Sequence, residues 1–168
     1  MAAALGSAAL GWASSDRSNR KVSTWEREAR AFYLGAVDRV SDPRGRDLLQ
    51  QLADFEAYHY RNLAAYREAL LAGREPEPYV GRELRPSLEG GKATRQATNL
   101  ETVADILTAA IGAEESARAR YEAWAAEAQV PAVQALFRRL AHEEAVHARI
   151  LNDEFYSLSN RGVWLWGD

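Results

Sequence analysis

The sequence predicts an all-α fold: a four-helix bundle built from a duplicated helical hairpin, with a long crossover between helices two and three. Three observations predict this fold. Four segments have helix-forming composition or apolar residues at helical spacing. Proline and glycine gather in one long stretch between the second and third segments. Finally, the two halves of the chain align with a single ungapped offset.

The first hairpin is expected over the first half of the chain. Helix one covers about residues 15–40, and Ser41-Asp42-Pro43 gives a stop followed by a proline suited to the first turn of the next helix. Helix two covers residues 44–72 and ends near Gly73. Its apolar side chains recur at helical spacing and form one stripe: Leu48, Leu49, Leu52, Phe55, Tyr58, Leu63, Tyr66 and Leu70.

Residues 73–98 are expected to form the crossover. This stretch carries Pro76, Pro78, Gly81, Pro86, Gly90 and Gly91. Fully extended it could span ~80 Å, which is ample for a bundle ~40 Å long, so helix three can begin beside the start of helix two and run parallel to it. Helix three is expected over residues 99–128, and helix four from Pro131 to about Leu158.

The two hairpins are related by a sequence duplication. Residues 26–33 align with residues 114–121, an offset of 88 residues (114 − 26). Residues 52–59 align with residues 140–147 at the same offset. The prolines that begin helices two and four also align. We therefore expect a bundle with pseudo-twofold symmetry.

Carboxylate and imidazole side chains recur at corresponding positions of the two halves. Each half has a Glu-x-x-His pair, whose side chains share one helix face, and a single glutamate on the preceding helix. Two single glutamates and two Glu-x-x-His pairs are the ligands of dimetal sites in helical bundles. The expected ligands are Glu26, Glu56, His59, Glu114, Glu144 and His147.

Chain geometry places these six residues at one level of the bundle. In an antiparallel hairpin, residues equally distant from the turn lie at the same height. The midpoint between Glu26 and the first pair falls at about Asp42, and the midpoint for the second half falls at about Val130. Both midpoints coincide with the expected turns, so the six side chains should converge.

Charge and ligand type indicate the metal. Four carboxylates balance two divalent ions, whereas without metal the cluster would suffer mutual repulsion and desolvation. Oxygen and nitrogen ligands suit iron or manganese, and zinc would bind without redox chemistry. The sequence has no cysteine, which excludes thiolate centres. We expect two iron ions, with manganese as the alternative.

The segments EREARAFY, LADFEAYH, EESARARY and LAHEEAVH resemble the helix motifs of the rubrerythrin and ferritin-like di-iron superfamily. The resemblance covers about residues 20–158. It implies a ferritin-like topology and the same six metal ligands. It also implies that Tyr33 and Tyr121 lie near the centre and hydrogen-bond to ligands.

The chain departs from rubrerythrins in two ways. Rubrerythrins carry an extra glutamate three residues after the ligand on helix three, where this chain has Ala117, and Ala29 is its counterpart. In that family the extra glutamate lets one iron move between ligands, a feature associated with fast reaction toward peroxide. The six-ligand set resembles bacterioferritin-type ferroxidase centres, although Met1 is the only methionine and leaves no ligand for their haem. The rubredoxin domain is also missing, so electrons must come from another protein or from substrate iron.

Other notable side chains are given lesser roles. Glu115 and Glu143 adjoin ligands but point about 100° away, so we expect them to be solvated or to contact ligands from outside. His142 has no counterpart in the first half, and we expect it at the surface or just outside the ligands. Trp164 and Trp166 are expected to cover the bundle end or a subunit interface.

The predicted function is that of a di-iron oxidoreductase reducing hydrogen peroxide or dioxygen with an external electron-donor protein. The alternatives are a ferroxidase or iron-storage protein and, less favoured, a metal-free structural bundle. A net charge of -3 argues against nucleic acid, and the absence of an apolar run of ~20 residues argues against a membrane span. We expect a cytoplasmic homodimer with an N-terminal arm (1–14), the bundle (15–158) and a tryptophan-containing tail (159–168).

Overall fold

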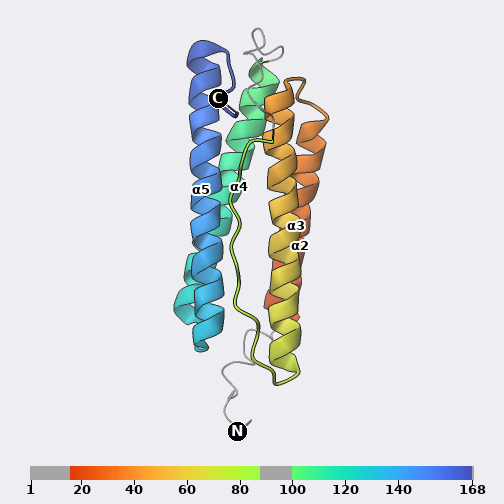
Figure 1. The fold of residues 1–168 in the computed structure, drawn as a ribbon, viewed down its shortest axis with the longest axis vertical. Helices are drawn as coiled ribbons and strands as arrows, with labels where there is room; N and C mark the ends of the chain where they lie inside the picture. Colours follow the sequence, from red (N-terminus) through yellow and green to blue (C-terminus); the bar gives the residue numbers. More distant parts are fainter. Residues whose placement is uncertain (1–15, 88–99, 168) are drawn as a thin grey trace.

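The computed structural model describes residues 16–87 and 100–167. This part of the chain contains four helices and is otherwise turns and irregular segments (Figure 1). The helices are α2 (Asp16–Val37), α3 (Pro43–Leu71), α4 (Leu100–Glu127) and α5 (Pro131–Arg161). The predicted all-α class is confirmed, whereas the arm expected at residues 1–14 and the end of the crossover lie outside the described residues. Along the described residues, no helix is long and apolar enough to cross a membrane.

The helices pack as two antiparallel hairpins, α2 with α3 and α4 with α5. The turns lie where the sequence predicted them. Asp42 caps α3, because its Oδ1 accepts a hydrogen bond of 2.9 Å from the backbone N–H of Arg44, and Pro43 occupies the first turn. Val130 holds the corresponding position before α5, again followed by a proline. The duplicated sequence therefore gives two hairpins that turn at corresponding residues.

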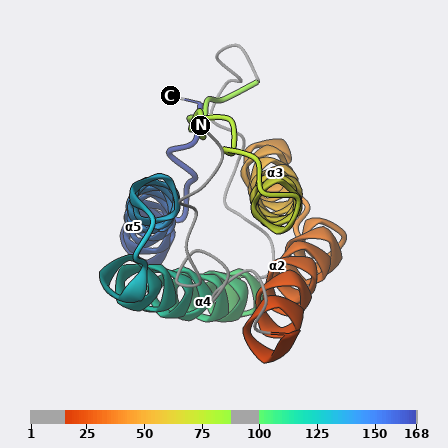
Figure 2. The ribbon, with the colours of Figure 1, turned by 90° about the horizontal axis from the view of Figure 1, so that it is seen from below.

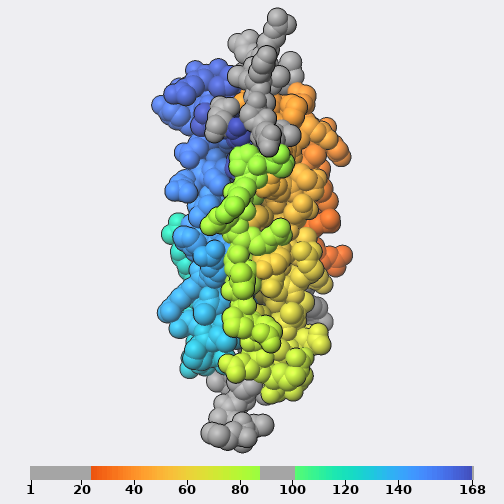
Figure 3. Space-filling model, in the orientation of Figure 1, coloured from red at the N-terminus to blue at the C-terminus, as the bar shows by residue number. Residues whose placement is uncertain are grey.

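The crossover sets the topology of the bundle. From the end of α3, residues 72–87 run back along the length of the molecule, toward the end of the bundle at which α4 begins, and α3 and α4 run in the same direction (Figure 1). Seen along the axis, the helices follow the order α3, α2, α4, α5, and the crossover lies on the side between α3 and α5 (Figure 2). Its residues fill the seam between these two helices on the surface (Figure 3). This arrangement is consistent with a ferritin-like four-helix bundle.

Two apolar clusters form the core, one toward each end of the bundle. One cluster includes Leu48, Leu52, Leu107 and Leu151, and the other includes Leu63, Leu136, Phe137 and Leu140. Most of these residues repeat at the offset of the duplication, so the two clusters are related in the same way as the hairpins. Buried glutamates and histidines lie between them, where apolar side chains above and below limit the access of water.

The C-terminal tail packs against the end of the bundle at which α3 begins. Helix α5 continues to Arg161, past the predicted end at about Leu158, and Gly162 ends it with a φ of 69°. Trp164 is 1% exposed and occupies the space in which a Cβ on Gly45 would lie. The Nε1 of Trp166 donates a hydrogen bond of 2.7 Å to Asp47. The two tryptophans thus cover one bundle end, which is one of the two roles expected for them.

Candidate metal centre

The six residues predicted as ligands gather into two buried clusters at the middle of the bundle. In each cluster, one ligand atom from each of three residues lies within 4.8 Å of the other two. We call them the His59 cluster (Glu26, Glu56, His59) and the His147 cluster (Glu114, Glu144, His147). Each cluster takes its single glutamate from the first helix of a hairpin and its Glu-x-x-His pair from the second. The pseudo-twofold relation expected from the sequence therefore holds at the site.

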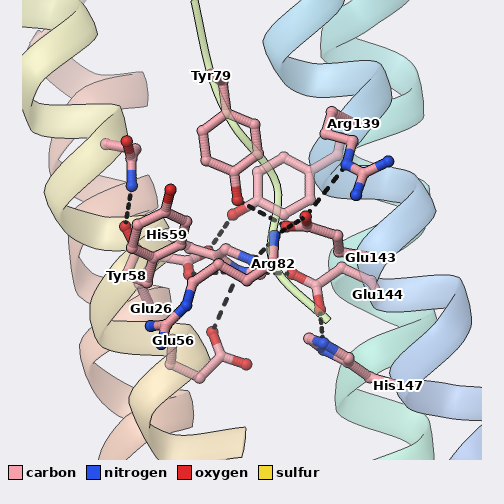
Figure 4. A network of polar contacts seen from close by, with 12 residues as sticks. Glu26, Glu56, Tyr58, His59, Tyr79, Arg82, Arg139, Glu143, Glu144 and His147 are labelled. Carbon is pink, nitrogen blue, oxygen red and sulfur yellow. Dashed lines mark hydrogen bonds and ion pairs between the residues drawn. The ribbon is translucent and has the colours of Figure 1, made fainter. Parts of the chain in front are cut away.

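In the His59 cluster, the imidazole turns its Nδ1 toward the carboxylates. This atom lies 3.6 Å from Glu26 Oε2 and 4.0 Å from Glu56 Oε2. It also lies 3.1 Å from Oε1 of Glu144, which belongs to the other cluster (Figure 4). Glu144 thus reaches the His59 cluster from the opposite hairpin.

In the His147 cluster, Nδ1 of the imidazole lies 3.2 Å from Glu144 Oε2 and 3.5 Å from Glu114 Oε2. The two oxygens of Glu144 therefore face different histidines. The rings of His59 and His147 are nearly parallel, with centroids 6.1 Å apart. This arrangement makes Glu144 the carboxylate best placed to lie between two metal ions.

Two tyrosines connect the hairpins across the centre. The hydroxyl of Tyr33 donates a hydrogen bond to Glu114, and the hydroxyl of Tyr121 donates one to Glu26. Burial and the neighbouring carboxylates raise the pKa of both tyrosines well above its ordinary value, so both remain protonated donors. The contacts are those that the family resemblance implied for Tyr33 and Tyr121.

The buried ligand atoms fit a metal because several of them have no hydrogen-bond partner. These atoms are Glu26 Oε2, His59 Nδ1, Glu114 Oε2 and Glu144 Oε1, of which His59 Nδ1 and Glu144 Oε1 lie at an ion-pair distance of 3.1 Å without forming a hydrogen bond. Leaving a buried polar atom unpaired costs about 1–3 kcal/mol, and more for a charged group. All four atoms point into the two clusters, and carboxylate oxygen with imidazole nitrogen is a donor set that divalent iron and manganese accept. The arrangement is consistent with a dimetal site, and the residues by themselves do not select the metal.

Without metal, protons must offset the negative charge of the clusters. Burial and the neighbouring glutamates raise the pKa of Glu56, and that of Glu114 to about 8. Burial alone would lower the pKa of His147, but Glu114 and Glu144 outweigh it and raise that pKa to about 9. Burial also opposes ionisation of Glu144, yet the two histidines keep its pKa well below the usual range. A binding metal would have to displace these protons.

The position of Glu143 decides between the two expectations for it, a solvated side chain or a contact with a ligand. It is 3% exposed, so the expectation that it is solvated is wrong, whereas contact with a ligand is correct. Its Oε2 lies 3.1 Å from Nε2 of His59 and accepts a hydrogen bond of 2.6 Å from the hydroxyl of Tyr79 (Figure 4). Burial would raise its pKa, but these hydrogen bonds outweigh burial and lower it. Glu115 and His142, in contrast, are exposed.

Tyr79 reaches the centre from the crossover, and no motif or spacing in the sequence marks this role. Prolines and glycines marked residues 73–98 as irregular but could not show where the chain lies. A tyrosine among turn-forming residues was the only available sign that part of the crossover is anchored.

A cavity of about 320 Å³ reaches the centre from the side of α2 and α4. Its walls include the carboxylates of three residues predicted as ligands and several small or aromatic residues. The lining comprises Trp25, Glu26, Glu28, Ala29, Phe32, Glu56, Ala113, Glu114, Ser116, Ala117 and Arg120. Ala29 and Ala117 hold the two positions at which an extra carboxylate would enter this space. The cavity lies on the α2–α4 side of the bundle, whereas the crossover covers the seam between α3 and α5.

Comparison with known proteins supports the resemblance for the second hairpin. No curated protein and no solved structure matches the chain. The model of the rubrerythrin family matches residues 105–161, which span most of α4 and all of α5. This range includes Glu114, Tyr121, Glu144 and His147, and the first hairpin repeats the same motifs at an offset of 88 residues (147 − 59). Residues 105–161 of this chain are thus similar to the rubrerythrin family, whose members are ferritin-like di-iron proteins.

Proposed function

We propose that this chain is a non-haem di-iron oxidoreductase of the rubrerythrin type, which reduces hydrogen peroxide or dioxygen. The observation that carries the proposal is the pair of buried Glu/Glu/His clusters, with unpaired ligand atoms directed into both. Two ferrous ions would supply two electrons, which with two protons reduce hydrogen peroxide to two water molecules. The rubrerythrin match over the second hairpin supports the same chemistry.

The residues around the clusters have distinct roles in this proposal. The six glutamates and histidines would hold the metals, and Glu144 faces the histidines of both clusters. Tyr33 and Tyr121 orient Glu114 and Glu26 through hydrogen bonds without binding metal. The apolar clusters at both ends exclude water, and the cavity between α2 and α4 gives a small oxidant access to the carboxylates.

A second candidate is a ferroxidase that oxidises ferrous iron for storage. The observation that favours it is the pair of alanines, Ala29 and Ala117, in the cavity at positions where an extra carboxylate would make a rubrerythrin centre. Glu28 lines the same cavity and is exposed, which suits the entry of cations. Assembly size separates the candidates, because storage requires a large cage whereas we propose a cytoplasmic homodimer that receives electrons from another protein.

Metal analysis of the purified chain tests the proposal. We expect two iron ions per chain after anaerobic reconstitution, and one hydrogen peroxide consumed for each diferrous centre. His147→Ala should lose most of one metal, whereas the matched change His142→Ala, at an exposed histidine of the same helix, should lose none. A His147→Ala protein that retains both metals with unchanged affinity would remove that residue from the site. A wild-type chain that binds no metal would leave only the structural bundle.

A further inference from the structure

The two histidines of the centre differ in what lies beside Nε2, the ring nitrogen that faces away from the carboxylates of the clusters. For His59, Nε2 lies 3.1 Å from Oε2 of Glu143, while Nδ1 faces the carboxylates (Figure 4). A carboxylate at Nε2 fixes the tautomer that carries its proton there, which leaves the lone pair of Nδ1 for a metal. His59 is therefore held ready to bind.

Glu143 is itself fixed by donors from three directions. Tyr79 donates to its Oε2 at 2.6 Å, while the backbone N–H of Arg82 and the Nε of Arg139 donate to its Oε1 at 3.0 and 3.2 Å. The crossover passes so close that a Cβ on Gly81 would lie 2.2 Å from Oε1 of Glu143. With His59, both carboxylate oxygens thus receive two donors each. A carboxylate held in this way cannot turn aside when the imidazole binds a metal.

In the part of the chain that the structure describes, the His147 cluster has no carboxylate in the position that Glu143 holds beside His59. At the offset of 88 residues, the counterpart of Glu143 is Phe55 (143 − 88). The Phe55 ring lies edge-on to the His147 ring, with centroids 4.8 Å apart and planes at 85°. Within residues 16–87 and 100–167, no side chain or backbone group accepts a hydrogen bond from Nε2 of His147. The two halves of the duplicated sequence therefore differ at this position: a glutamate contacts His59, whereas a phenylalanine contacts His147.

We propose that the two metal positions are inequivalent, and that the His59 cluster binds a divalent cation first and more tightly than the His147 cluster. The proposal rests on the dimetal function proposed above. Loss of a hydrogen-bond partner behind a metal-binding histidine lowers metal affinity by about 10–100-fold. Glu143 supplies such a partner to His59 and not to His147. Glu143 is a positioning residue, and the crossover residues that hold it form part of the metal site.

A zinc titration of the full metal-free chain tests the order of binding. Zinc is diamagnetic, and the sequence has three histidines, so ¹⁵N-histidine NMR resolves each ring. The signals of His59 should shift during the first equivalent and those of His147 during the second, while exposed His142 stays unchanged. Calorimetry should show two steps whose affinities differ by about 10–100-fold.

Variants of Glu143 separate positioning from general stability. Glu143→Gln keeps the shape but loses the charge, so it should weaken the first step about 10–100-fold and leave the second unchanged. Tyr79→Phe, which removes one donor and keeps Glu143, should weaken the same step less and provides a milder test if Glu143→Gln folds poorly. The control Glu154→Gln alters another buried glutamate of α5, one that accepts a hydrogen bond from the backbone of Leu165, and should change neither step.

The outcomes distinguish this proposal from the metal centre itself. Binding of two zinc ions with equal affinity, or filling of the His147 cluster first, would overturn the inequivalence and leave the dimetal centre intact. Unchanged affinities in folded Glu143→Gln and Tyr79→Phe would show that Glu143 has no positioning role. A wild-type chain that binds no zinc, iron or manganese would reject the proposed function.

Discussion

The hydroxyl of Tyr121 on the second hairpin donates a hydrogen bond to Glu26 on the first. In the opposite direction, the hydroxyl of Tyr33 on the first hairpin donates a hydrogen bond to Glu114 on the second. Each hairpin therefore supplies a donor to a carboxylate of the other, in addition to the approach of Glu144 to His59. The three residues of each cluster lie within one hairpin, but these contacts join the two clusters, so packing of the hairpins and assembly of the two clusters into one centre are one event.

This exchange predicts the effect of removing one hydroxyl. In the metal-free protein, Tyr121→Phe should lower the free energy of unfolding by about 1–3 kcal/mol, because an oxygen of buried Glu26 loses its donor. The variant should still bind two metals, since the tyrosine is not a ligand, but its rate of oxidation should change. Chemical denaturation with metal analysis and stopped-flow kinetics measures all three. Loss of the metals would mean that the tyrosine has a larger structural role.

The pKa shifts predict opposite pH dependences for the metal-free and the loaded protein. The folded pKa values of about 8 for Glu114 and about 9 for His147 lie above the ordinary values of 4.5 and 6.5. The folded, metal-free chain therefore binds more protons than the unfolded chain between these limits, and its stability should fall as pH rises. Because metal displaces these protons, the stabilisation by metal should grow over the same range.

Thermal unfolding between about pH 6 and pH 9, with a chelator or with two equivalents of manganese, measures both trends. The melting temperature of the chelated protein should decrease across the range, and the gap to the loaded protein should widen. His147→Gln removes one of the groups whose raised pKa causes this trend and should flatten the decrease. A chelated protein whose melting temperature rises toward pH 9 would contradict this account of the cluster charges.

Much of the fold could be predicted from the sequence because its signals are periodic and duplicated. The turn before α3 depends on a local pattern of aspartate followed by proline, and the hydrogen bond from Arg44 to Asp42 follows from that pattern. The two Glu-x-x-His pairs lie on helix faces whose spacing fixes their direction. With the offset of 88 residues (144 − 56), these local rules place all six residues at one level.

The surroundings of Glu143 could not be predicted in this way. Its neighbour Glu144 points into the centre, and a helical turn of about 100° directs Glu143 elsewhere, toward a segment without periodicity. Whether that direction led to water or to Tyr79 depended on the course of the crossover, which is set by tertiary contacts. Phe55, the apolar counterpart of Glu143, did not indicate that the two histidines differ, because a phenylalanine in an apolar stripe is explained by packing alone.

Two glycines in helices provide a prediction about the C-terminal tail. A Cβ on Gly45 would lie 2.3–2.8 Å from ring atoms of Trp164, whereas Gly112 has no atom within 4 Å of its Cβ position. Gly112→Ala should therefore stabilise the protein by up to about 1 kcal/mol, the difference in helix propensity. Gly45→Ala should destabilise the protein, because the Trp164 ring must move. It should also alter the tryptophan fluorescence of the folded protein. Equal stability of the two variants would show that the tail does not contribute to the core.

The last prediction concerns oxidant preference and depends on the space at Ala117. This residue lies one turn after Glu114, on the same helix face, and lines the cavity of about 320 Å³. A glutamate here would have room to extend toward the metals and would restore the seventh carboxylate of rubrerythrins. A seventh carboxylate would let one bound metal ion exchange ligands when its charge changes, whereas the six residues present would hold the two ions at fixed positions.

We therefore expect Ala117→Glu to raise the ratio of the peroxide rate to the dioxygen rate. Stopped-flow oxidation of the diferrous protein by each oxidant, at equal concentration, measures this ratio. Ala117→Gln is the matched control, because it fills the same volume with a poorer ligand and should slow both reactions without changing their ratio. X-ray absorption of the loaded variant shows whether the new carboxylate binds iron. If it binds and the ratio stays unchanged, oxidant preference is set by access through the cavity, and a role for the missing carboxylate must be abandoned.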